Sequence, residues 1–597
     1  MIYQKVAGEV AKAVENLYQL KISEAEVQIQ KTKKEFEGDV TIVVFPFTRA
    51  AKKPPQQIGE EVGHFLKEHL DFISTYNVIK GFLNLSVSTA YWTDFLQKNL
   101  QNEHYGIEEV QQGAPVVIEY SSPNTNKPLH LGHVRNILLG YSIAEILKAA
   151  GRNVKKVNLV NDRGIHICKS MLAWRKWGEG VTPQEAGKKG DKLVGDYYVQ
   201  FEKQNKLEVK QRMLEGESEE EAAAHSVLLM EAREMLKNWE KGDIEVRNLW
   251  EKMNSWVYKG FGKTYRRMGV DFDKIYYESD TYLLGRKIVE DGLEKGLLHQ
   301  KDDGSVWADL SDKGLDEKLL LRADGTSVYM TQDLGTAQLR HDDFNPEKLL
   351  YVVGNEQNYH FDVLKIILKK LKRDWSDDIL HISYGMVELP HGKMKSREGT
   401  VVDADDLMDE MHEKARKTTT ELGKIEDFSE RESEKLFELI GQGALKYYIL
   451  KVDPKKNMLF NPDESIQFDG NTGPFIQYTH ARIQSLLRKA KEKGFEKPYL
   501  EGDLGDMAFL PREKQIIRQL HEFPAIVKQA ADTFSPAVVA NYVYELVKEY
   551  NGFYQDTPVL KEEDEHKINF RLAMSDFTGK VIRESMRLLG VQVPERM

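Results

Sequence analysis

The chain has 597 residues, of which 41% are hydrophobic and 30% are charged. This balance is typical of a globular protein and argues against a disordered or membrane-spanning one, because no apolar run is long enough to cross a bilayer. The formal net charge of −11 argues only weakly against a nucleic-acid partner, since a basic face can lie on an acidic protein.

The length exceeds what one hydrophobic core supports, so several domains are expected. Residues 1–112 are predicted to form an α/β domain, followed by a linker rich in turn-forming residues near 102–115. The first residues are amphipathic and lack the continuous apolar core of a signal peptide. The spacing of apolar residues predicts helices near 1–18 and 55–70, and strands over 40–46 and 82–87.

From 113 to 430, strand and helix patterns alternate, which is typical of a Rossmann-type doubly wound parallel sheet. A charged helical stretch near 195–265 is interpreted as an insertion, and residues 431–597 are predicted to form an all-α bundle. The predicted strands of the central region are 115–120, 154–160, 349–353 and 381–389, and its helices include 131–150 and 361–372.

Cys168 is the only cysteine, which excludes a disulfide within the chain and a thiolate zinc site. It lies in an apolar stretch and is interpreted as a small buried hydrophobic residue. A chain without disulfides suits the reducing cytoplasm, so a cytoplasmic location is expected. Because no thiolate site can be built, no protein-bound zinc or other metal is expected either.

The most specific pattern is Glu119-Tyr-Ser-Ser-Pro-Asn-Thr-Asn-Lys-Pro-Leu-His-Leu-Gly-His133. It places His130 and His133 at the start of a helix, directly after a strand and a loop. A helix start offers free N–H groups to an anion, and the imidazoles can donate to phosphate oxygens as charge builds on the α-phosphate. Gly132 lets a nucleotide approach the backbone. These three residues are therefore predicted to bind ATP, with the histidines as catalytic groups.

This pattern resembles the HIGH signature of class I aminoacyl-tRNA synthetases, and its longer form is similar to that of arginyl-tRNA synthetases. The resemblance implies an arginine–tRNA ligase that uses ATP and Mg²⁺ to form arginyl-adenylate from L-arginine, and then charges the 3′ end of tRNA(Arg). It also implies a monomer with a catalytic domain at 113–430, between an N-terminal domain at 1–112 that touches the tRNA elbow and an anticodon-binding domain at 431–597.

A second pattern, Lys393-Met-Lys-Ser-Arg397, resembles the KMSKS loop of the same class. Lys393, Lys395 and Arg397 can neutralise pyrophosphate in the transition state, and Met394 and Ser396 are expected to contact ATP. The fourth position, usually lysine, is Ser396 here. The resemblance implies that Lys127, just before the first motif, takes over the catalytic role of the missing lysine.

A planar guanidinium pairs well with carboxylates and other oxygen acceptors. Doubly wound sheets bind their ligands where the strands end, so acceptors at those positions are candidates to bind it. Tyr329 and Asp333 lie four residues apart, which puts them on one face if the segment is helical. The resemblance implies that Glu119 and Asp333 bind the charged groups of arginine, Tyr329 the guanidinium region, and Asn124 and Gln357 its amino or carboxylate end. Unpaired polar groups would reject other amino acids, so no editing domain is expected.

Two further positions have open roles. His360 either contacts the adenine of ATP or caps the helix that follows it, and the sequence does not decide between them. Asp162 matches a loop position of the family, with less support for a role.

The C-terminal third is similar to the anticodon-binding domain of the family. Tyr448, Tyr478, His480 and Arg482 are predicted to stack on unpaired bases or to contact phosphates, although aromatic residues in a helical bundle usually form its core. In the N-terminal domain, Asn84 is predicted to read a base edge. Its neighbours Val87 and Ser88 depart from the aromatic and glutamine residues of the family pattern.

Three alternatives remain open on the motifs. A small-molecule nucleotidylyltransferase also uses His-x-Gly-His, but it needs no long helical C-terminal region. A non-catalytic RNA-binding relative is the second, although it would be expected to have lost His130, His133 or the basic loop. Another class I synthetase, for cysteine or glutamate, is the third, and the absence of zinc-type cysteines counts against the cysteine enzyme.

Overall fold

The predicted doubly wound fold is confirmed, and its centre is a sheet of five parallel strands in the order β12-β11-β5-β6-β7. All four residues of β5 are buried, as expected of a parallel strand with helices on both faces. The strands are β5 (Val116–Glu119), β6 (Val154–Val160), β7 (Lys274–Tyr277), β11 (Lys348–Gly354) and β12 (Ile379–Tyr384).

The strand order determines where a ligand can bind. From β5 the chain proceeds to β6 and β7 on one side, and later to β11 and β12 on the other. The connections that follow β5 and β11 therefore leave the sheet in opposite directions. Such a switch point opens a crevice at the carboxyl ends of the strands, where sheets of this type bind their ligands.

Helices cover both faces of the sheet. α5 contacts β5, β6 and β11 on one face, while α12, α13 and α14 share a hydrophobic core with Val117 on the other. Alternate residues of a strand point to opposite faces, so Glu119 points toward the same face as Val117. The helices are α5 (Leu131–Ala149), α12 (Leu284–Glu294), α13 (Tyr329–Phe344) and α14 (Asn358–Lys370).

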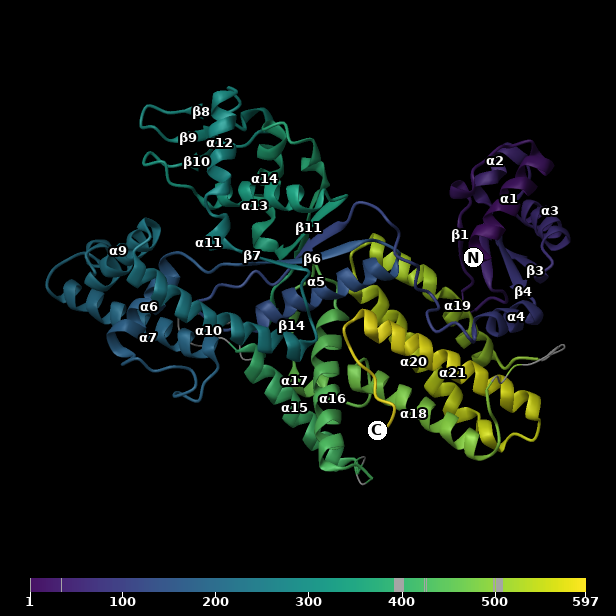
Figure 1. Cartoon of the computed structure of the whole chain (residues 1–597). Helices are drawn as coiled ribbons and strands as arrows, with labels where there is room; N and C mark the ends of the chain where they lie inside the picture. The colour runs from purple at the N-terminus through teal and green to yellow at the C-terminus, as the bar shows by residue number, and fades with distance from the viewer. Residues whose placement is uncertain are drawn as a thin grey trace. The chain divides into compact units, whose positions relative to one another are not determined.

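Two insertions lie between the strands. Between β6 and β7, helices α6, α7, α9 and α10 contact one another and form an arm (Figure 1). After β7, a short helix α11 (Glu278–Thr281) leads to a small antiparallel sheet of β8, β9 and β10. The bounds are α6 (Ile165–Trp177), α7 (Gly190–Leu214), α8 (Glu219–Ala224), α9 (Val227–Lys241), α10 (Ile244–Met268), β8 (His299–Gln300), β9 (Val306–Ala308) and β10 (Lys318–Leu321).

The computed structural model describes residues 2–33, 35–390, 402–423, 425, 427–497, 500 and 508–597. Within these ranges, no helix has the length and apolar character needed to cross a membrane. The chain divides into two units. One is Met1–Tyr105, Leu486–Glu522 and Lys548–Lys580, and the other is Gly106–Ser485, Phe523–Val547 and Val581–Met597, which contains the parallel sheet.

The first unit contains an antiparallel sheet in the order β1-β2-β4-β3. The predicted strand at 40–46 ends at Val43, because Phe45–Phe47 forms a 3₁₀ turn around Pro46. Its elements are α1 (Ile2–Tyr18), β1 (Ile29–Lys31), β2 (Val40–Val43), α2 (Thr48–Ala51), α3 (Pro55–His69), β3 (Ile73–Ile79), β4 (Phe82–Val87) and α4 (Thr89–Asn99).

The C-terminal region is helical, as predicted. Its helices contribute segments to both units. They are α15 (Ala404–Glu421), α16 (Glu430–Leu450), α17 (Pro462–Ser465), α18 (Gly473–Glu492), α19 (Pro511–Asp532), α20 (Pro536–Asp556) and α21 (Glu565–Leu588).

The predicted strand at 381–389 is divided in two. β12 ends at Tyr384, and β13 (Val387–Glu388) pairs instead with β14 (Met458–Leu459). Gly385 lies at the break, where an added Cβ would come within 2.5 Å of the Lys456 backbone. The chain therefore leaves the sheet at a close backbone approach that only glycine permits.

Substitution of Gly140 by alanine is expected to destabilise the second unit, because an added Cβ would lie 2.3 Å from the Cβ of buried Tyr120. Overpacking of this kind costs about 1–3 kcal/mol, which exceeds the helical preference for alanine. Thermal unfolding of Gly140→Ala measures the effect. Gly262→Ala is the matched control, since its new Cβ would approach only the tip of the flexible Arg266 side chain, at 3.3 Å. Equal midpoints for the two variants would contradict the packing argument.

Candidate active site

The loop between β5 and α5 is held in one conformation by buried amides. Ser121 and Ser122 have φ angles of 80° and 42°, in the left-handed region that non-glycine residues seldom adopt. The N–H of Ser121 donates to Asn136 Oδ1 at 2.6 Å, and the N–H of Ser122 donates to Asn158 Oδ1 at 3.0 Å. The surroundings therefore stabilise a turn that the local sequence alone would not prefer.

The two histidines of the first motif lie together at the start of α5. Their ring centroids are 3.9 Å apart. Nδ1 of His130 accepts a hydrogen bond from the N–H of Gly132, and Nδ1 of His133 accepts one from the N–H of His130, both at 3.2 Å. In a neutral imidazole the proton must then be on Nε2, so both rings keep an Nε2–H donor for a ligand.

Burial keeps both histidines uncharged. Burial and the nearby Lys127 lower the pKa of His130 to about 3. Burial, His130 and Lys127 lower the pKa of His133 well below its ordinary value. Burial also lowers the pKa of Lys127, which lies in the same cluster. The site therefore offers neutral donors beside one cation.

The backbone at the start of α5 is less available than the sequence suggested. The N–H of Leu131 donates to the carbonyl of Val402 at 3.1 Å, and the N–H of Gly132 is used by His130. Two of the first N–H groups of the helix are thus already paired, so the imidazole Nε2–H groups are the better donors to an anion. Val402 is the fifth residue after Arg397, the last residue of the predicted KMSKS loop. Lys393, Met394, Lys395, Ser396 and Arg397 themselves lie outside the described residues.

The Glu119 carboxylate, predicted to bind arginine, has two partners within the chain. Oε1 accepts a hydrogen bond from Ser122 Oγ at 2.9 Å, and Oε2 forms an ion pair with Arg340 of α13. Arg340 is 2% exposed and lies against the rings of Tyr276 and Tyr351. Sequence analysis did not single out Arg340, although its position seven residues after Asp333 puts both on one face of the helix, about two turns apart.

Asp333 and His360 were predicted to bind different ligands, but the fold brings them together. His360 Nε2 lies 2.6 Å from Asp333 Oδ2. The ring of His360 thus pairs with a carboxylate, while the N-cap position of α14 is occupied by Gln357, which makes no side-chain cap hydrogen bond. Tyr329, Asn124 and Gln357 are exposed. Tyr329 is the first residue of α13, one turn before Asp333.

Glu278 is an acidic residue of this site that sequence analysis missed. It follows β7 directly, at the carboxyl edge of the sheet. Burial raises the pKa of Glu278 to about 7, Arg163 opposes the shift, and the carboxylates of Asp162 and Asp333 add to it. The position of Glu278 directly after a strand was the signal by which the sequence could have identified it. A cation that enters near the Glu278 carboxylate would offset the cost of its burial.

Asp162 has a structural role in this arrangement. Its carboxylate accepts hydrogen bonds from Tyr258 at 2.7 Å and from the N–H and Oγ of Ser279, each at 2.8 Å. These contacts tie the loop after β6 to α10 and to α11. Little of the carboxylate is left for a ligand.

The residues predicted to contact tRNA fall into two groups. Tyr448, Tyr478 and Arg482 are partly exposed, and the guanidinium of Arg482 lies 4.8 Å from the ring centre of Tyr478. Asn84 and His480 are buried. The amide of Asn84 bonds to Thr41 at 2.6 Å and Asn77 at 2.9 Å, and His480 Nδ1–H donates to the carbonyl of Pro594 at 2.9 Å. As placed here, these two residues support the protein interior and present no surface to RNA.

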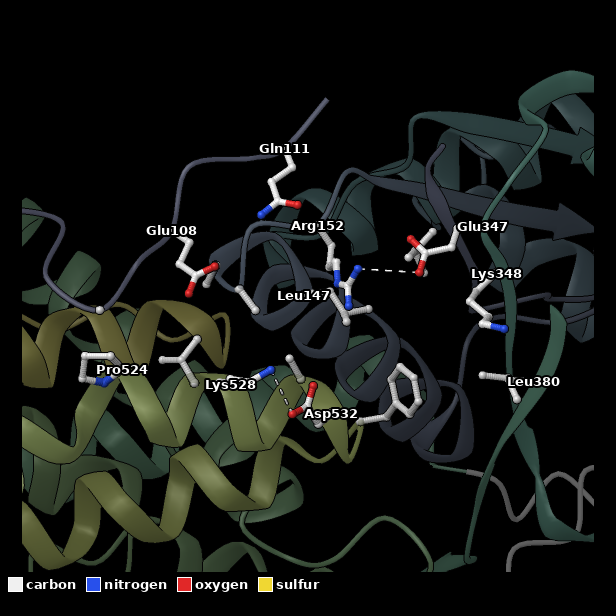
Figure 2. Close-up of a pocket in the computed structure, with 17 residues that line it drawn as sticks. Glu108, Gln111, Leu147, Arg152, Glu347, Lys348, Leu380, Pro524, Lys528 and Asp532 are labelled. Atoms are coloured by element: carbon white, nitrogen blue, oxygen red, sulfur yellow. Dashed lines mark ion pairs between the residues drawn. The ribbon is translucent and has the colours of Figure 1, made fainter. Parts of the chain in front are cut away.

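A cavity of about 400 Å³ lies at the opposite edge of the sheet, near the amino ends of β5, β11 and β12. Figure 2 shows Arg152 facing Glu347 and Lys528 facing Asp532 around it, as ion pairs of 3.6 Å and 3.3 Å. None of the predicted site residues lines this cavity. The candidate active site is therefore the carboxyl edge of the sheet, where His130, Glu119 and Glu278 lie.

Comparison with known families assigns nearly the whole chain. Residues 95–461 match the family described as "tRNA synthetases class I (R), catalytic domain". Residues 476–597 match the "DALR anticodon binding domain", and residues 4–87 match the "Arginyl tRNA synthetase N terminal domain".

Individual relatives agree with these matches. The chain is 57% identical over 598 residues to an arginine–tRNA ligase of Parabacteroides distasonis, and 58% identical over 597 residues to one of Bacteroides fragilis, each covering 100% of both chains. Its fold is similar to that of the Thermus thermophilus arginyl-tRNA synthetase, with a TM-score of 0.80, 24% identity and coverage of 100% of both chains. For the Plasmodium falciparum arginyl-tRNA synthetase the TM-score is 0.75 at 20% identity, covering 100% of this chain and 99% of that one.

The neutral state of His130 predicts how stability depends on pH. The unfolded chain protonates this histidine near its ordinary pKa of about 6.5, whereas the folded chain does so only near pH 3. Its contribution is therefore present above about pH 6.5 and is lost as the pH falls toward 3. At about pH 5.5 the loss is on the order of 1 kcal/mol. His130→Asn keeps a side-chain oxygen for the helix cap but cannot titrate, so its unfolding midpoint should fall less between about pH 7.5 and 5.5 than that of the unmodified chain. Parallel pH profiles would contradict this assignment.

Proposed function

Because the chain belongs to the arginyl-tRNA synthetase family of class I enzymes, we propose that its crevice joins L-arginine to tRNA(Arg) at the expense of ATP. In the first step, a carboxylate oxygen of arginine attacks the α-phosphorus of ATP, and pyrophosphate leaves. In the second step, a terminal ribose hydroxyl of the tRNA attacks the arginyl carbonyl, loses its proton, and AMP leaves. The observation that carries the proposal is the meeting, at one sheet edge, of neutral imidazole donors and acidic side chains.

The nucleotide is proposed to lie over the start of α5. The Nε2–H groups of His130 and His133 would donate to the α-phosphate as its charge grows, and Gly132 leaves room for the ribose or base. Neutral imidazoles suit this role, because they donate hydrogen bonds to the phosphate and carry no extra proton that would have to be released during the reaction. Lys127 is proposed to add positive charge beside them. Lys393, Lys395 and Arg397 would neutralise the pyrophosphate, with Met394 and Ser396 as further ATP contacts, and His360 beside the nucleotide.

The arginine side chain is proposed to extend toward Asp333 and Glu278. Glu119 is already balanced by Arg340, so the net negative charge that attracts a guanidinium comes mainly from the other two carboxylates. Tyr329 would pack on the guanidinium, while Asn124 and Gln357 would bind the amino and carboxylate groups. In this arrangement the guanidinium of arginine pairs with the carboxylates of Asp333 and Glu278, whose negative charge is costly to bury without a partner.

Magnesium enters this scheme as part of the substrate MgATP. Among the described residues, no group of three or more histidine, cysteine, aspartate or glutamate side chains could hold a metal. We therefore assign no step to a metal held by the protein. A divalent ion on the phosphates would neutralise charge on the leaving pyrophosphate.

On the tRNA side, Tyr448, Tyr478 and Arg482 are the proposed contacts of the anticodon region, since they combine partly exposed rings with a cation. His480 would support the surface of α18 from inside, and Asn84 would support the sheet of the N-terminal domain from inside. We further propose that residues 1–112, 113–430 and 431–597 act as the elbow-binding, catalytic and anticodon-binding domains. A cytoplasmic monomer is proposed on the family resemblance.

An aminoacylation assay with each of the twenty amino acids and total tRNA tests the proposed reaction. Arginine should be the only amino acid charged, since a site that leaves polar groups unpaired rejects others by about 10⁴-fold. Asp333→Asn should raise KM for arginine roughly 10–100-fold, the cost of one charged hydrogen bond. Asp342→Asn is the matched control, because this exposed aspartate of the same helix lies on the solvent side with 63% of its side chain accessible. Charging of another amino acid, or equal effects of the two substitutions, would refute the specificity argument.

Arginine binding should also depend on the ionisation of Glu278. Its pKa of about 7 means that the free enzyme loses this charge as the pH falls below 7, while the guanidinium of arginine stays protonated. The dissociation constant of arginine should therefore be constant above about pH 8 and rise by up to about tenfold per pH unit below 7. Calorimetric titration across this range measures it. Glu278→Gln should bind weakly and without this dependence, whereas an unchanged pH profile in that variant would remove Glu278 from the site.

A further inference from the structure

Arg340 of α13 is a buried cation beside the proposed arginine site. It is 2% exposed, and Glu119 is the only carboxylate among the described residues with which it forms an ion pair. Its guanidinium lies 5.5 Å from the ring centre of Tyr276 and 5.1 Å from that of Tyr351. Its Nε is buried and has no hydrogen-bond partner within the described part of the chain. The Glu119 carboxylate is therefore the main polar contact of this cation.

A buried ion pair of this kind is a poor source of stability. Burial alone would lower the pKa of Arg340, and the Glu119 carboxylate raises it above its ordinary value instead. The attraction between two such charges is largely offset by the loss of their hydration, and apolar side chains of similar volume often pack at lower cost. The clearest effect of the pair is electrostatic, because the two charges cancel at the end of β5.

The substrate makes this cancellation important. Free arginine has a cation at each end, the α-ammonium beside its carboxylate and the guanidinium at the tip of its side chain. The proposed site also has carboxylates for both ends, because Glu119 ends β5 while Asp333 lies on α13 and Glu278 follows β7. Glu119 begins the loop that leads to His130, so the substrate carboxylate must lie at the Glu119 end to reach the nucleotide. An arginine bound in reverse would fill the site without reacting.

The two acidic ends face one compartment. Asp333 precedes Arg340 by seven residues, about 10 Å along α13. Burial raises the pKa of Tyr351 to about 12, and Arg340 opposes this shift. The carboxylates of Glu119 and Asp333 both add to it. The Tyr351 hydroxyl thus senses the balanced pair and the acidic end together, and a ligand in the same place would do so too.

We propose that Arg340 is a positioning residue that fixes the orientation of arginine in the site. Because it balances Glu119, the end near the nucleotide has no net negative charge, and the guanidinium is attracted to Asp333 and Glu278 instead. The oxygens of Glu119 can still accept hydrogen bonds from the α-ammonium, and the substrate carboxylate beside it meets no net repulsion. The inference rests on the proposed function and adds to it a residue that orients the substrate.

Calorimetric titration of the full-length chain with L-arginine and with agmatine, which is arginine without its carboxylate, tests this role at about pH 7.5, where cations and carboxylates are charged. Arg340→Met leaves Glu119 unbalanced. Agmatine, which has both cations, gains an attraction, whereas for arginine the attraction of the α-ammonium and the repulsion of the carboxylate nearly cancel. The ratio of the agmatine dissociation constant to that of arginine should therefore fall roughly tenfold, as expected of one unbalanced buried charge.

Aminoacylation kinetics supply the second readout. Arginine bound in reverse occupies the site but does not react, so kcat of Arg340→Met should fall roughly tenfold or more, while the dissociation constant of arginine changes by less than about threefold. Loss of packing alone would not separate the two ligands in this way. Arg340→Lys keeps the cation, so its ratio should stay near that of the unmodified chain and kcat should recover most of the loss.

Two further variants complete the test. Glu119→Gln/Arg340→Met removes both charges and should restore the ratio, which keeps the test informative where Arg340→Met lowers stability. Arg152→Met is the matched control, because Arg152 pairs with Glu347 at the opposite edge of the sheet, and both readouts should stay unchanged. An unchanged ratio in Arg340→Met, or a ratio that neither Arg340→Lys nor the double variant restores, would overturn the orienting role. Failure of arginine to bind the unmodified chain would refute the proposed function itself.

Discussion

The side-chain amide of Asn136 joins the loop after β5 to the neighbouring strand β11. Its Oδ1 accepts from the N–H of Ser121, and its Nδ2 donates to the carbonyl of Val352, both at 2.6 Å. Loss of the amide would leave two buried polar groups unpaired, at about 1–3 kcal/mol each. Because Asn136 lies on α5, one side chain fixes the strand end, the left-handed turn and the helix start relative to one another. The positions of Glu119 and His130, at the two ends of this loop, depend on this junction.

Burial then divides the crevice into two electrostatic regions. At the start of α5 it removes the charge of His130 and His133, so that they remain donors without adding a proton to the chemistry. Near α13 and β7 it raises the pKa of Glu278 and leaves carboxylates that are stabilised by an incoming cation. The uncharged imidazoles add no repulsion of the guanidinium to that of Lys127, and the carboxylates near α13 and β7 attract it. One desolvation effect thus serves both substrates.

Helix α5 links these regions to the rest of the protein. Its Arg135 donates to the carbonyls of Met386 at 2.8 Å, Pro454 at 3.2 Å and Lys456 at 2.7 Å. These carbonyls belong to the segments that follow β12 and α16. Ser142, two turns later, donates to the carbonyl of Leu588 at 2.8 Å. The helix that carries the histidines is therefore held by polar contacts along its length, as expected of an element that must keep its position while ligands change.

Local sequence patterns were sufficient for the fold class. The apolar strand at 115–120, the helix at 131–150 and the helical C-terminal region follow from the periodicity of their residues, and the long motif from Glu119 to His133 indicated the reaction. The four-residue spacing of Tyr329 and Asp333 was also informative, since both residues do lie on the same helix, α13. The break at Gly385 was missed, because it results from the backbone of Lys456, which lies 71 residues away.

By itself, the sequence determined which chemical groups this protein has and on which kind of element each one lies, because side-chain periodicity is a local property of the backbone. Only the tertiary structure decided their partners and charge states. It paired Glu119 with Arg340 and His360 with Asp333, buried Asn84 and His480, and placed Glu278 beside Asp333. The physical reason is that desolvation and ion pairing depend on residues that are distant along the chain and meet only when the sheet assembles.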